Sequence, residues 1–64
     1  MENYPMVTVE FKNLPNFRCL LTEWEDMGGY RGFLKEYAMP IHAIKKVLTE
    51  VLPATAYPTQ AWEG

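Results

Sequence analysis

The chain has 64 residues, 48% of them hydrophobic, and its six basic and eight acidic side chains give a formal net charge of -2. A chain this short forms one domain with a thin core, and its weak negative charge disfavours general attraction to nucleic acid or anionic lipid. The apolar runs are too short for a membrane-spanning helix, and no charged segment leads into an apolar block as in a secretory signal. We therefore expect a soluble, cytoplasmic protein that does not associate with membranes.

Cys19 is the only cysteine and His42 is the only histidine. A disulfide within the chain is therefore excluded, and a structural zinc site, which normally takes four Cys or His ligands, is not predicted. No cofactor-binding motif is present, so we predict no cofactor and no metal. Because a core of this size usually needs reinforcement, the sequence leaves self-association as the available reinforcement, and a homodimer is one prediction.

The first predicted element is a strand at Val7–Phe11, where apolar and polar side chains alternate with the period of a half-buried strand. Asn13, Pro15 and Asn16 then favour a turn. An extended pattern resumes over Phe17–Trp24, although residues 19–21 place apolar side chains on both faces. We predict a second strand here, antiparallel to the first.

Glycines at positions 28, 29 and 32 predict a tight connection after the hairpin. Beyond them, apolar side chains recur at helical spacing over Tyr30–Ala38. We predict a short helix in this segment. The alternative is a third strand that continues the hairpin as a meander.

The clearest periodicity lies in Ile41–Leu52, where six aliphatic side chains would form one stripe of a helix. Pro40 suits the first turn of such a helix, and Pro53 would end it. We predict an amphipathic helix that covers the sheet, because two strands alone are marginally stable. The expected fold is α+β, with an antiparallel sheet of two or three strands under this helix. In this prediction residues 1–53 form the compact domain and residues 54–64 form an irregular tail.

Two pairs of residues have side chains suited to catalysis. Cys19 and His42 would act as nucleophile and base if the imidazole lay within hydrogen-bond reach of the thiol. Glu23 and Glu25 would project to the same side of an extended strand about 7 Å apart, a spacing used in acid and base catalysis. However, Cys19 lies in an apolar segment, and a thin core leaves little volume for a pocket of about 300 Å³ or more. We therefore do not expect an enzyme.

The segment from Glu23 to Tyr30, where the second strand gives way to the glycines, combines acids with aromatic residues and a methionine. As structure, Asp26 and the glycines would form a turn, and Trp24 would close the strand against the edge of the core. As a surface, Trp, Tyr and Met are enriched at protein interfaces, and carboxylates attract a basic patch on a partner. We predict that a larger protein with a basic or apolar patch binds here, at Glu23, Trp24, Glu25, Asp26, Met27 and Tyr30.

The leading functional hypothesis is a small, non-enzymatic protein-binding module. It would act as an inhibitor or accessory factor by occupying a surface of a larger protein, as small proteins of phages and mobile elements often do. The alternative is a small dimeric nucleic-acid-binding regulator whose basic side chains contact phosphates. Neighbouring acids reduce the positive electrostatic potential around these basic side chains. Nucleic-acid binding is therefore the weaker hypothesis. The residues concerned are Arg18, Arg31, Lys45 and Lys46.

Overall fold

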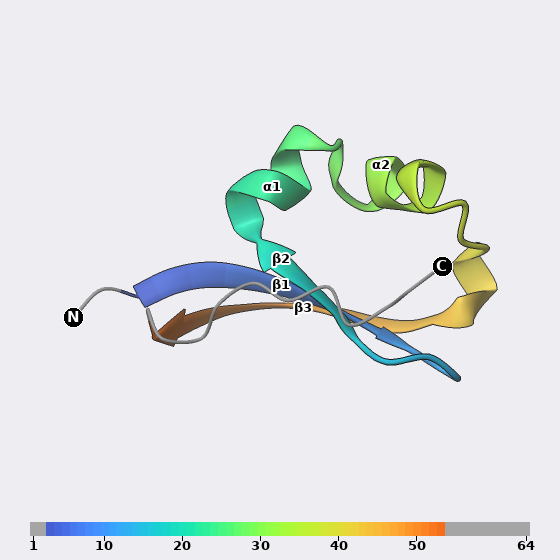
Figure 1. Ribbon diagram of the computed structural model, residues 1–64, viewed down its shortest axis with the longest axis horizontal. Helices are drawn as coiled ribbons and strands as arrows, with labels where there is room; N and C mark the ends of the chain where they lie inside the picture. Colours follow the sequence, from blue (N-terminus) through green and yellow to red (C-terminus); the bar gives the residue numbers. More distant parts are fainter. Residues whose placement is uncertain (1–2, 54–64) are drawn as a thin grey trace.

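The computed structural model describes residues 3–53 and shows a small α+β fold, as the sequence predicts. Two short helices lie on one side of a three-stranded antiparallel sheet (Figure 1). The tail predicted at residues 54–64 lies outside the described residues. In chain order the elements are β1 (Asn3–Phe11), β2 (Phe17–Leu20), α1 (Leu21–Asp26), α2 (Gly29–Glu36), the 3-10 helix η1 (Ile41–Ala43) and β3 (Ile44–Pro53).

The central strand of the sheet is β1, with β2 on one side and β3 on the other, both antiparallel to it. The β1–β2 hairpin confirms the strand predicted at Val7–Phe11 and pairs Val9 with Phe17. The strand begins earlier than predicted because β3 pairs with it as far as Asn3, which lies opposite Pro53. Both edges of β1 therefore have hydrogen-bonded partners.

The helix predicted at Ile41–Leu52 is wrong, because this segment forms η1 and then the edge strand β3. The same residues that make a helical stripe also carry a strand signal. Val47, Thr49 and Val51 are β-branched and occur at every second position, which suits one face of a strand. As a helix, this segment would leave one edge of β1 without hydrogen-bond partners, whereas β3 satisfies that edge. The helices that cover the sheet are α1 and α2 instead.

The second strand is shorter than the predicted Phe17–Trp24, since β2 ends at Leu20 and the chain continues directly into α1. Glu23 explains where this helix begins. Its carboxylate oxygen Oε1 accepts a hydrogen bond from the backbone N–H of Leu20 at 3.2 Å, as a glutamate at the third helical position commonly does. In the helix, Leu21 and Trp24 lie three residues apart on one face, and both pack on the core.

Two glycines determine how α1 meets α2, the helix that confirms the one predicted at Tyr30–Ala38. Gly28 joins the two helices with a φ of 105°, in the left-handed region that favours glycine. Gly32 lies so close to the end of α1 that a Cβ at this position would overlap the carbonyl oxygen of Met27. The tight junction keeps both short helices over the same face of the sheet.

The core lies between the helices and the face of the sheet that they cover. Phe33 of α2 is fully buried, with its ring centroid 4.9 Å from that of Phe17 and 6.1 Å from that of Phe11. On the helical side, the same ring lies 5.4 Å from Trp24 and 5.0 Å from Tyr37. Aromatic pairs at these distances add about 0.5–1.5 kcal/mol each beyond the burial of their area. Phe33 therefore joins the two layers. The other buried members of this cluster are Val7, Val9, Cys19 and Ile44.

Candidate functional site

Trp24, the centre of the predicted contact surface, lies in the core. Its side chain is only 9% exposed, and its ring packs on Phe33. A buried indole holds its own helix in place and offers little area to a partner. The structure therefore gives Trp24 the role of anchoring α1, and the other residues of the predicted surface are the ones with accessible side-chain area.

Those neighbours are mostly acidic and exposed. Glu23, Glu25 and Asp26 are exposed on α1, and we call these three side chains the acidic α1 surface. Met27 and Tyr30 are half-buried and pack against the core, so that each leaves only part of its apolar area accessible. The surface is thus dominated by charge, with a small apolar margin.

The expectation that Glu23 and Glu25 project to the same side is wrong, because they lie in a helix and not in a strand. Residues two apart in an α-helix are rotated by about 200°, so their side chains diverge. Glu23 also turns back to the backbone of Leu20. The structure therefore does not form the predicted pair of carboxylates.

Cys19 and His42 are also not brought together. Cys19 is 2% exposed within the core, whereas His42 is exposed on η1. Burial and, to a smaller extent, the nearby charge of Glu23 together raise the pKa of the Cys19 thiol to about 11. A thiol with this pKa stays protonated at neutral pH, and the thiolate is the nucleophilic form. The structure therefore gives Cys19 the role of a packing residue in the core.

The raised pKa predicts a slow reaction of Cys19 with thiol reagents. A shift from 9.0 to about 11 lowers the thiolate fraction at pH 8 by about a hundredfold. We expect an aromatic disulfide reagent to label the folded protein at least that much more slowly than the urea-unfolded protein. Equal rates in the two states would show that Cys19 is accessible.

The same pKa shift predicts how stability depends on pH. The folded state keeps the thiol proton to a higher pH than the unfolded state does. The contribution of the protonated thiol to the free energy of unfolding is therefore fully present below pH 9 and is lost as the pH rises towards 11. The melting temperature of Cys19→Ala should therefore fall less between pH 9 and pH 11 than that of the parent. An equal fall in the melting temperatures of the parent and the variant would contradict the raised pKa of Cys19.

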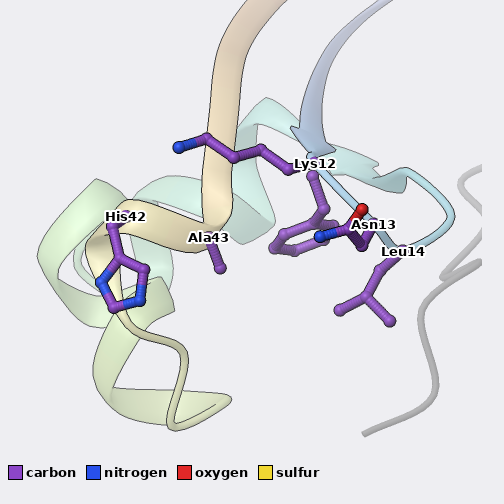
Figure 2. Close-up of a pocket in the computed structure, with 6 residues that line it drawn as sticks. Lys12, Asn13, Leu14, His42 and Ala43 are labelled. Carbon is purple, nitrogen blue, oxygen red and sulfur yellow. The ribbon is translucent and has the colours of Figure 1, made fainter.

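A pocket of about 310 Å³ lies where the turn between β1 and β2 meets η1. The two segments are joined by a backbone hydrogen bond of 3.1 Å from the N–H of Lys12 to the carbonyl oxygen of Ala43. In Figure 2, Leu14 and His42 stand on opposite sides of Ala43, and the Lys12 side chain runs across above it. The lining is formed by Phe11, Lys12, Asn13, Leu14, His42 and Ala43.

The chemistry of this pocket is limited to a few groups. Its volume is at the lower end of the range of about 300–1,000 Å³ for small-molecule sites. The ammonium, amide and imidazole groups of Lys12, Asn13 and His42 are its polar side-chain groups, and none of the described residues that line it is an acid. Within residues 3–53, no three His, Cys, Asp or Glu side chains are grouped to hold a metal ion.

The basic residues of the nucleic-acid hypothesis are spread over both sides of the sheet. Arg18 on β2 and Lys46 on β3 lie on the face of the sheet that the helices do not cover. Lys46 is directly opposite the acid Glu10. Arg31 belongs to α2, on the other side. Lys45 lies at the irregularity in the pairing of β1 with β3. Within the described part of the chain these four residues form no common surface.

Two features of the structure have no counterpart among the predictions. The pocket is formed by residues 11–14 together with residues 42–43, and no local sequence pattern predicts that these two distant segments meet. The exposed edge of β3 was missed because its segment was assigned to a helix. Val47, Thr49 and Val51, which are β-branched and alternate along the chain, were the signal that could have found it.

None of the helices formed by residues 3–53 has the length and apolar character needed to span a membrane. Comparison of the chain with models of protein families, with curated proteins and with solved structures finds no match.

Proposed function

We propose that the protein is a small protein-binding module that uses the acidic α1 surface to dock on a basic patch of a larger protein. Occupation of that patch would make it an inhibitor or an accessory factor. The single observation that supports this proposal is the exposure of Glu23, Glu25 and Asp26 on a helix that is anchored by a buried tryptophan.

Anchoring matters because binding is costly when the binding element must first become ordered. Trp24 and Leu21 attach one face of α1 to the core, and Gly28 and Gly32 bring its end close to α2. The carboxylates are therefore carried by an element that is already folded. No basic residue lies in the last turn of α1 to neutralise them.

The charge of this surface determines the kind of partner. Exposed carboxylates raise the rate of encounter with a basic patch and reject an acidic one. The accessible parts of Met27 and Tyr30 at the margin supply side chains of the types enriched at interfaces. We place the encounter in the cytoplasm, where the buried, unpaired thiol of Cys19 would stay reduced.

Charge reversal tests this proposal. The protein is used as bait in extracts of its own cells, with and without nuclease, and the captured partner is identified by mass spectrometry. Glu25→Lys is expected to weaken binding of that partner about tenfold, mainly by slowing association, and to reduce the salt dependence of binding.

The matched control is Glu36→Lys, which makes the same charge change at an exposed position of α2 outside the acidic α1 surface. It should change the affinity less than about twofold. Equal losses from the two variants would show that only net charge matters. Capture that disappears with nuclease would favour the nucleic-acid hypothesis instead.

A further inference from the structure

The edge strand β3 exposes apolar side chains and a row of backbone groups that no other strand of residues 3–53 pairs with. It is the outer strand of the sheet, paired only with β1 among the described residues. Val47 is 36% exposed and Val51 is 64% exposed. An irregularity beside Lys45 and a proline at position 53 occupy its two ends, and such features block pairing with another strand. The segment between them has neither a bulge nor a proline, and its charged side chains are Lys46 and Glu50.

We infer that β3 pairs antiparallel with β3 of a second copy of the chain, about a twofold axis at Leu48. The two sheets would then form one continuous sheet of six strands, with both helical layers on the same side. This inference is independent of the proposed partner, because α1 packs on β1 and β2 and lies away from the β3 edge.

Charge complementarity favours a second copy of the chain as the binding partner of β3, and it also favours one register between the two β3 strands. Lys46 and Glu50 lie two residues before and two residues after Leu48. A twofold axis at Leu48 therefore places Lys46 of each copy directly opposite Glu50 of the other. Oppositely charged cross-strand pairs stabilise an antiparallel sheet, and like charges in these positions destabilise it.

Neighbouring registers lack this match. A continuous sheet keeps each face on its own side, so the axis moves by whole residues, to Val47 or to Thr49. With the axis at Val47, the residue opposite Lys46 is Leu48; with the axis at Thr49, it is Leu52. Glu50 then faces an aliphatic side chain in either case. Only the axis at Leu48 pairs both charges.

The cross-strand neighbours of Lys46 and Glu50 within one copy of the chain also favour this arrangement. Lys46 lies opposite Glu10 of β1, so the second copy would place it between two acids. Glu50 lies opposite Met6 and has no charged cross-strand neighbour in its own sheet. On the helix side of the sheet, Val47 of one copy would lie opposite Thr49 of the other. These are both β-branched residues, which pack well across strands.

A charge swap tests the inference in solution. Sedimentation of the parent over a range of concentrations is expected to show a monomer–dimer equilibrium. Lys46→Glu and Glu50→Lys should each weaken dimerisation about tenfold, because each creates two like-charge pairs per dimer. The double variant restores opposite charges between the copies and should bind more tightly than either single variant, with a remaining loss because the new acid at position 46 faces Glu10 of its own sheet.

The control is Lys35→Glu on α2, which changes the net charge as Lys46→Glu does but lies away from the edge. Circular dichroism of each variant establishes that it is folded. A parent that remains monomeric up to its solubility limit would overturn the inference. A double variant no better than the single ones would also overturn it.

Cysteine cross-linking tests the register separately. Residues opposite each other in an antiparallel pair have Cβ atoms about 4.5–5.5 Å apart, close to disulfide geometry. Leu48→Cys should therefore form a disulfide-linked dimer under mild oxidation, while the buried Cys19 stays unreacted. Faster cross-linking of Val47→Cys or Thr49→Cys would contradict the axis at Leu48.

Discussion

Phe33→Ala is expected to unfold most of the protein at room temperature. Removal of a fully buried phenylalanine costs about 3–5 kcal/mol, and a core of this size supplies only about 3–5 kcal/mol in total. The cost should lie at the upper end, since the ring touches both layers through Phe17 and Trp24. Far-UV circular dichroism and urea titration would measure the loss.

The matched control is Leu34→Ala, at the next position of α2. Leu34 is half-buried at the margin of the core, so its removal should cost less than half as much as that of Phe33. Both changes give the helix an alanine, which removes helix propensity as an explanation of the difference. A cooperative melt of Phe33→Ala within a few degrees of the parent would show that the core is organised differently.

Gly32→Ala is expected to destabilise the protein although it improves helix propensity. In an unobstructed helix, alanine is more favourable than glycine by about 1 kcal/mol. At this position the new Cβ would overlap the carbonyl oxygen of Met27, and a backbone group cannot yield without displacing the α1–α2 junction. We expect a net loss of about 2 kcal/mol or more, which corresponds to a fall in melting temperature of about 8 °C or more.

Gly29→Ala is the comparison for this variant. Gly29 has a φ of 69°, but a Cβ there would lie 3.8 Å from Nε1 of Trp24, at ordinary contact distance. Its cost should be limited to the backbone strain of about 1 kcal/mol. An increase in melting temperature of Gly32→Ala would mean that the two helices are not in close contact.

The parts of the fold that sequence patterns predicted correctly are those with one dominant period. Val7–Phe11 alternates strictly, and Tyr30–Ala38 has helical spacing beside glycines that separate it from the preceding segment. Ile41–Leu52 fits both periods, and the choice between them depends on β1, whose second edge needs a partner. The need of β1 for a second hydrogen-bonding strand is a tertiary interaction, and the sequence of Ile41–Leu52 alone does not reveal it.

The candidate site was predicted only in part for a similar reason. The acids of α1 were recognised by composition, and the structure leaves them exposed. Trp24 was assigned to the same surface because tryptophan is frequent at interfaces, yet it packs on Phe33, a residue nine positions later. Whether an aromatic side chain lies inside or outside depends on such partners. Because β2 ends at Leu20, Trp24 lies in a helix, and its side chain there points into the core.

The central position of β1 has a consequence for synthesis of the chain. Strand β1 must wait for β3, which is synthesised after α2, since Asn3 lies opposite Pro53. A nascent chain that has emerged only as far as α2 has a hairpin and two helices but lacks the strand β3. Contacts between such distant positions slow folding. The sheet is therefore completed only after β3 has been synthesised, and a chain interrupted before β3 would carry an inner strand with one unpaired edge, which favours aggregation.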